Sequence, residues 1–158
     1  MEDYNLVPRA KKCIEQSIEL ANVHKHGKAN CAHLFSALIQ SATVPVKTIL
    51  SNKFNLHLDN LIKALLIELP QVEPNYFKKT KSQDWWHKDF ELAMKEAFAV
   101  SEKFDHNFIG VEHLICGILN TDNITKKFLI EKSVPCEDIV ETMLQMLDPF
   151  SEEKVEDK

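Results

Sequence analysis

The sequence predicts an all-α fold in which a four-helix unit occurs twice in tandem, related by a pseudo-twofold axis. Residues 29–39 return in similar form as residues 109–119, so His33 and His113 lie 113 − 33 = 80 residues apart. The chain has only 3 glycines and 6 prolines, and its apolar residues recur at helical steps of three and four. A repeat this long indicates a duplicated helical unit, because such a unit cannot bury its apolar face alone.

The first unit is expected to span residues 1–69. Pro8 suits a first helical turn, because its missing N–H would have no partner there. From this proline, apolar and small residues form one helical stripe. The stripe consists of Ala10, Cys13, Ile14, Ser17, Ile18, Ala21 and His24. Three shorter helices are expected to follow, near residues 31–40, 44–54 and 57–69.

The second unit, residues 87–148, repeats this organisation. Its long helix carries a matching stripe, made of Phe90, Ala93, Met94, Ala97, Phe98, Ser101 and Phe104. Shorter helices are expected near residues 111–120, 123–132 and 136–147. Asp122 and Asn123 are candidates to cap one of these helices, and Pro135 is expected in the first turn of another.

Two segments lack helical periodicity. Residues 70–86 contain two prolines and mixed polarity, which predicts a linker between the units. Trp85 and Trp86 end this linker, and we expect them to dock onto the helices rather than to form an exposed binding surface. Residues 149–158 form an acidic tail, which is interpreted as a flexible end or as the start of a linker to another module.

Bulk composition excludes several classes of partner. A net charge of −5 argues against a nucleic-acid surface. No apolar run approaches the roughly 20 residues of a membrane span, and the first residues do not resemble a secretory signal. The 4 cysteines have no CxxC spacing, so free thiols in a reducing cytoplasm are expected.

The sequence shows no catalytic or cofactor-binding motif, so we predict that the chain is not an enzyme. Glu112 and His113 are adjacent, and neighbours on a helix do not face each other. His24, His26, Cys31 and His33 suggest a metal site, but zinc needs four converging ligands. Of this set, the second half keeps only His106 and His113. We therefore expect no metal and no cofactor, and interpret His33 and His113 as helix-start residues bonded to nearby backbone.

The repeated unit resembles the N-terminal domain of the Clp ring chaperones and unfoldases. Residues 106–119 are similar to the family pattern HNxxGTEHLLxGLL. Residues 8–12 and 32–38 carry the resemblance in the first half, and residues 69–73 are similar to the inter-repeat segment of ClpB disaggregases. Together these segments cover about residues 6–147.

The resemblance implies a non-catalytic module that captures unfolded or tagged client proteins, or adaptor proteins, and passes them to a Clp-type ATPase ring. By position, an apolar client groove would involve Val7, Val100 and His113. Val7 and Val100 are equally consistent with plain core positions. His113 makes the implied groove more polar.

Some ClpC-like members recognise phosphorylated arginine through a glutamate and a hydroxyl residue in each repeat. Here Ala32 and Val7 take those positions in the first half, and Glu112 and His87 take them in the second. The implied site is therefore at best partial and confined to the second half. A carboxylate at Glu112 suits a guanidinium, although a capping role at a helix start is the alternative.

A dedicated interaction module is the alternative function. One branch of the family, ClpV, grips a single helix of a secretion sheath, and free-standing accessory subunits of the Clp protease carry the same fold. An open apolar groove between the halves would favour general client capture. A groove fitted to one helix would favour the dedicated module.

Overall fold

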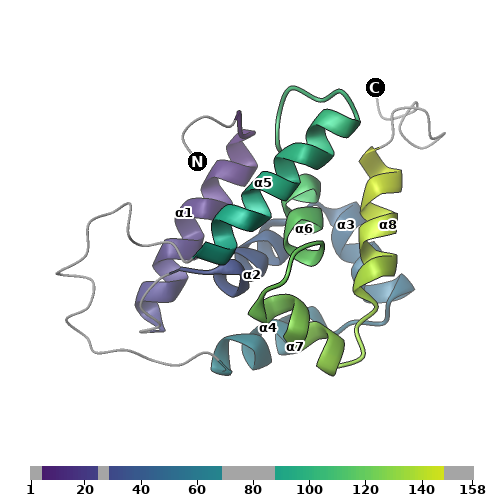
Figure 1. Cartoon of the computed structure of the whole chain (residues 1–158). Helices are drawn as coiled ribbons and strands as arrows, with labels where there is room; N and C mark the ends of the chain where they lie inside the picture. The colour runs from purple at the N-terminus through teal and green to yellow at the C-terminus, as the bar shows by residue number, and fades with distance from the viewer. Residues whose placement is uncertain (1–4, 25–28, 69–87, 148–158) are drawn as a thin grey trace.

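The computed structural model describes residues 5–24, 29–68 and 88–147, which form eight α-helices and one π-helical turn (Figure 1). The helices of the first half are α1 (Pro8–Val23), α2 (Cys31–Ser41), α3 (Val44–Thr48) and α4 (Leu58–Ile67), with the π-helical turn η1 (Ile49–Lys53) continuing α3. Those of the second half are α5 (Lys88–Lys103), α6 (Val111–Leu119), α7 (Ile124–Glu131) and α8 (Cys136–Leu147). The predicted all-α fold of two four-helix units is confirmed.

Local signals place several helix starts where the sequence predicted them. Pro8 opens α1 in the first turn. The Asn123 side chain accepts the Lys126 N–H at 2.9 Å and caps α7, as expected for one of the two candidates. Pro135 lies just outside α8, and its carbonyl accepts the Ile139 N–H. α5 begins and ends 80 residues after α1, since 88 − 8 and 103 − 23 both equal 80.

The short helices α2 and α6 form the centre of the molecule (Figure 1). Every residue of α2 from Cys31 to Ile39 is buried, and so is every residue of α6 except Glu112. α2 contacts α5, α6 and α7 of the other half as well as its own neighbours. The two repeats therefore share one core, instead of burying two separate ones.

The space between the two halves is closed by side chains from both. Phe35, Ile39 and Leu50 meet Ile115, Leu129 and Ile139 around a residual void of about 10 Å³. A void of this size is near the lower limit for one water molecule. No helix of a partner fits between the repeats at this place.

Several expectations fall outside the described residues. These are the linker at 70–86 with its two tryptophans, the tail at 149–158, His26 and His87. Within the described part, no single helix is both long and apolar enough to cross a membrane. One bent pair, α2 with Val44–Lys53, reaches that length and composition only when its two parts are taken together.

Candidate functional site

The segment before α1 pairs with the segment that leads into α6 at a crossover, which we define as residues 5–7 together with residues 107–112. Leu6 and Ile109 form a parallel β-bridge. The Val7 N–H donates to the Ile109 carbonyl at 3.0 Å, and the Ile109 N–H donates to the Asn5 carbonyl at 2.8 Å. Asn5 Nδ2 also donates to the Asn107 carbonyl at 2.7 Å. The segment before α1 is thereby fixed beside the segment before α6.

A turn after α5 leads the chain into this crossover. Asp105 adopts a left-handed backbone conformation with φ of 59°, which a short polar side chain tolerates better than most. The His106 N–H then donates to the Ser101 carbonyl at 2.8 Å and closes the end of α5. Phe108 follows this turn and stays 37% exposed.

A histidine closes the start of each central helix. His33 Nδ1 accepts the Asn30 N–H at 3.0 Å, and His113 Nδ1 accepts the Gly110 N–H at 2.8 Å. Each histidine occupies the third helical position, where a side chain can reach back to the N-cap N–H. The predicted bonding of both helix-start histidines to nearby backbone is confirmed.

The hydrogen bonds also assign the tautomers of the His106 and His113 rings. His113 Nδ1 is an acceptor, so we place the proton of its neutral ring on Nε2. Nε2 lies 3.0 Å from His106 Nδ1, which must then be the acceptor. Phe104 and Phe108 stack on the two faces of the His106 ring. This aromatic column holds the loop between α5 and α6.

Three predicted site residues converge on Gly110. A Cβ at this position would lie 3.7 Å from His113 Nδ1, 3.8 Å from Glu112 Oε1 and 3.8 Å from Val7 Cγ2. Val7 and Glu112 are partly exposed. An apolar methyl group and a carboxylate therefore border the same small surface at the crossover.

The remaining predicted residues are placed differently. His113 is 0% exposed and Val100 is 5% exposed, so neither presents a surface to a client. Burial agrees with the core alternative for Val100, which faces the shared core from α5. His87 lies outside the described residues. The sequence analysis did not name Leu6 or Phe108. The only sign of their role in the sequence is that each belongs to a short apolar pair that precedes a helix, α1 or α6.

The four cysteines are free and buried. Burial raises the pKa of the Cys116 thiol to about 12, and the charges of Glu112 and Glu96 add to this effect. Burial, followed by the charge of Asp89 and a hydrogen bond to it, raises the pKa of Cys31 well above its ordinary value. Such thiols are poor nucleophiles at neutral pH, because only the thiolate reacts.

Asp89 links the two halves at a second place. It lies at the start of α5, is 8% exposed, and accepts the Cys31 N–H through Oδ1 at 3.3 Å. Its carbonyl accepts the Cys31 thiol, also at 3.3 Å. A carboxylate at the start of α2 is favoured by the helix dipole. Among residues 5–24, 29–68 and 88–147, no group of three or more His, Cys, Asp or Glu is arranged to hold a metal ion.

Comparison with known proteins identifies this arrangement. The sequence model of one protein family, the Clp repeat (R) N-terminal domain, matches residues 5–133, which is most of the chain. The chain belongs to the Clp N-terminal domain family. No curated protein is significantly similar to it in sequence.

Solved structures of Clp N-terminal domains share the fold. The N-terminal domain of the caseinolytic protease associated chaperone ClpD from Arabidopsis thaliana is 19% identical, with a TM-score of 0.71, and the match covers 90% of this chain and 94% of that one. The Hsp104 N-terminal domain from Candida albicans is 14% identical, with a TM-score of 0.70 and coverage of 90% and 91%. A structure from a malarial protein secretion system is 19% identical, with a TM-score of 0.70 and coverage of 92% and 97%.

Proposed function

We propose that this Clp N-terminal domain is a non-catalytic receptor that captures unfolded client segments at the crossover and delivers them to a Clp-type ATPase ring. The observation that carries the proposal is that Val7 and Glu112 both border Gly110 at the junction of the two repeats. Phe108, which precedes Gly110 by two residues, is partly exposed, and its ring contacts that of His113. Two apolar side chains that are only partly buried beside a carboxylate suit a segment with apolar and basic residues.

The geometry of the crossover supports capture rather than catalysis. The histidines and cysteines near it are engaged in the core: His113 bonds to backbone, and the thiols have raised pKa values. The exposed groups offer contact area and one charge, which suit binding. A small contact surface predicts weak, rapidly reversible binding, as a receptor that hands on its clients requires.

A binding measurement with matched variants tests this proposal. The probe is a fluorescently labelled polypeptide that is permanently unfolded, titrated with the domain and followed by anisotropy. We expect Val7→Asp to weaken binding about tenfold, since burying one valine on binding contributes roughly 1.5 kcal/mol. Val23→Asp is the control, because Val23 is 68% exposed at the far end of the same helix.

A second pair of variants, each losing one exposed ring, separates an effect on binding from an effect on folding. Phe108→Ser removes the exposed ring at the crossover, and Phe98→Ser removes a ring that is 40% exposed on α5. Only Phe108→Ser should weaken binding, with thermal unfolding measured for both variants. Equal losses for the crossover variants and their controls, or no loss for either crossover variant, would show that clients bind elsewhere.

A further inference from the structure

The outer face of α7 presents apolar and positively charged side chains around an open depression of about 820 Å³. Among the described residues, those that line it are Asp122, Asn123, Ile124, Lys126, Lys127 and Ile130. Ile124 is 39% exposed and Ile130 is 57% exposed. This surface is separate from the crossover, whose residues belong to the segments before α1 and α6.

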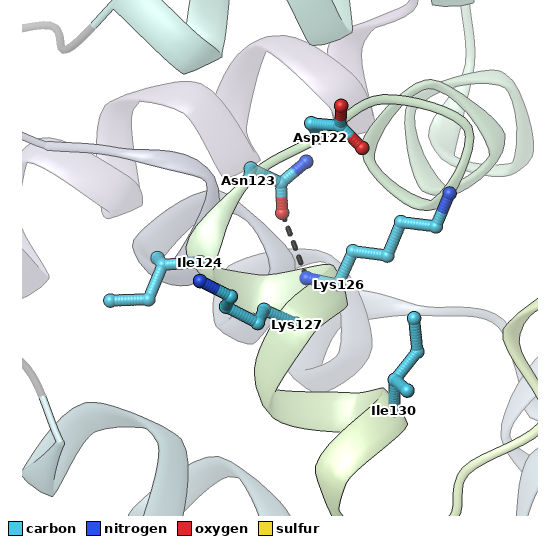
Figure 2. A pocket seen from close by; sticks show the side chains of 6 residues that line it. All are labelled: Asp122, Asn123, Ile124, Lys126, Lys127 and Ile130. Carbon is cyan, nitrogen blue, oxygen red and sulfur yellow. Dashed lines mark hydrogen bonds between the residues drawn. The ribbon is translucent and has the colours of Figure 1, made fainter.

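One face of α7 is buried and the opposite face is exposed. Thr125, Phe128 and Leu129 are buried and attach the helix to the core. Ile124, Lys127 and Ile130 follow one another at steps of three, so they lie along the other side of the helix. Figure 2 shows the Lys126 and Lys127 side chains leaving the helix in different directions, Lys127 on the side of Ile124 and Lys126 on the side of Ile130. A helix face that only contacts water does not need exposed isoleucines beside its lysines, so this face is a candidate binding surface.

The rim of the depression is fixed by Asn123. Its Oδ1 accepts the Lys126 N–H at 2.9 Å, which Figure 2 shows as a dashed line. Its Nδ2 donates to the Ile118 carbonyl at 2.8 Å and to the Thr121 carbonyl at 3.0 Å. Asn123 therefore holds the start of α7 against the end of α6. A partner meets a surface that is already ordered, which lowers the entropic cost of binding.

Charge distinguishes between possible partners. The chain as a whole has a net charge of −5, whereas the described residues that line the depression include two lysines and one aspartate, an excess of one positive charge. We propose that the outer face of α7 is a docking site for an acidic, amphipathic protein segment, one that sets leucine-like side chains against Ile124 and Ile130 and carboxylates against Lys126 and Lys127. This proposal does not depend on the function assigned to the crossover.

Titration with two synthetic peptides tests the proposal. One is a helix-forming peptide with a leucine stripe and glutamates elsewhere, and the other has lysine in place of every glutamate. Binding to the full chain is followed by NMR of the backbone amides. We expect only the acidic peptide to bind, with the largest shifts at residues 122–130, and its affinity to fall as salt rises.

Charge reversal at the site, compared with the same change elsewhere, isolates the role of the lysines. Lys126→Glu with Lys127→Glu should weaken binding of the acidic peptide by about fivefold or more, since each exposed ion pair contributes roughly 0.2–1 kcal/mol. Lys11→Glu with Lys12→Glu makes the same change in net charge on the exposed face of α1 and should have much less effect.

Apolar contact is tested in the same way. Ile130→Ser should weaken binding, whereas Leu92→Ser, at a position 51% exposed on α5, should leave it unchanged. Equal binding of both peptides, equal losses in the α7 and control variants, or shifts confined to the crossover would each overturn the proposal. So would shifts at residues 122–130 that appear on concentrating the protein alone, because a second copy would then be the occupant.

Discussion

Thr125 places a hydroxyl group in the core without a hydrogen-bond partner. It is 0% exposed in α7, and its Oγ1 has no donor or acceptor within reach among the described residues. An unsatisfied buried hydroxyl lowers stability, because it loses its bonds to water and gains none in return. This could not be predicted from the sequence, because threonine at a helix start is an ordinary residue.

Replacing Thr125 with valine should stabilise the domain. The substitution keeps the shape of the side chain and exchanges the unpaired hydroxyl for a methyl group. We expect the free energy of unfolding to rise by about 1 kcal/mol, measured by urea denaturation. Thr142→Val is the matched control, because Thr142 Oγ1 donates to the Asp138 carbonyl and accepts from Lys53 Nζ. That variant should lose about 1 kcal/mol, and a loss of stability in Thr125→Val would show that the hydroxyl has a partner after all.

At the scale of elements, α5 and α6 approach each other closely at Gly117. A Cβ added to Gly117 would lie 2.3 Å from the Ala93 carbonyl oxygen and 3.0 Å from the Ala97 nitrogen. The corresponding residue of the first repeat is Ala37, whose carbonyl accepts the Cys13 thiol at 3.7 Å. The two repeats are therefore alike in topology but differ in how closely their paired helices approach.

Gly117→Ala should destabilise the domain by about 1–3 kcal/mol, because the neighbouring atoms are backbone and cannot move aside without separating the helices. Urea denaturation measures the change. Gly110→Ala is the control, since a Cβ there would meet only ordinary contacts at 3.7–3.8 Å and the backbone φ of −112° suits alanine. Gly110→Ala should cost no more than about 1 kcal/mol, because Gly110 is the N-cap of α6 and alanine is less favourable than glycine there. Equal costs for both variants would exclude close helix approach as the cause.

Local sequence signals were sufficient to predict the helices, and long-range pairing explains what they missed. Pro8 and Asn123 act within one turn, so their roles are visible in the sequence itself. The bridge between Leu6 and Ile109 joins residues from different repeats, and no periodic pattern specifies it. η1 was expected as ordinary α-helix, because a π-helical turn depends on the packing around it.

The candidate site was harder to predict than the fold, for the same reason. Val7 and Glu112 were named through the family resemblance, and the structure brings both to Gly110. Val100 was named in the same way but lies in the core. Its burial follows from the face of α5 that meets α6, and periodicity alone does not show which edge of an apolar stripe remains exposed.

At the scale of the whole molecule, the two repeats are bound into one folding unit. α2 and α6 contact each other and helices of both halves. At the crossover, backbone hydrogen bonds join residues 5–7 to Ile109, and Asp89 of the second half bonds to the start of α2. Neither half buries its central helix alone, so independent unfolding of one repeat would expose the core of the other. We therefore expect a single cooperative transition.

A small cavity in the first repeat should consequently weaken both repeats. Ile14 is 6% exposed in α1, and Ile14→Val should lower the free energy of unfolding by about 0.5–1.5 kcal/mol. Native-state hydrogen exchange of the most protected amides in α2 and α6 should report the same loss in both helices, because both exchange through global unfolding. Ile67→Val, at a position 82% exposed, should leave both unchanged. If Ile14→Val lowered protection in α2 while α6 kept its own, the repeats would be separate folding units, and the crossover would be a contact between domains rather than part of a shared core.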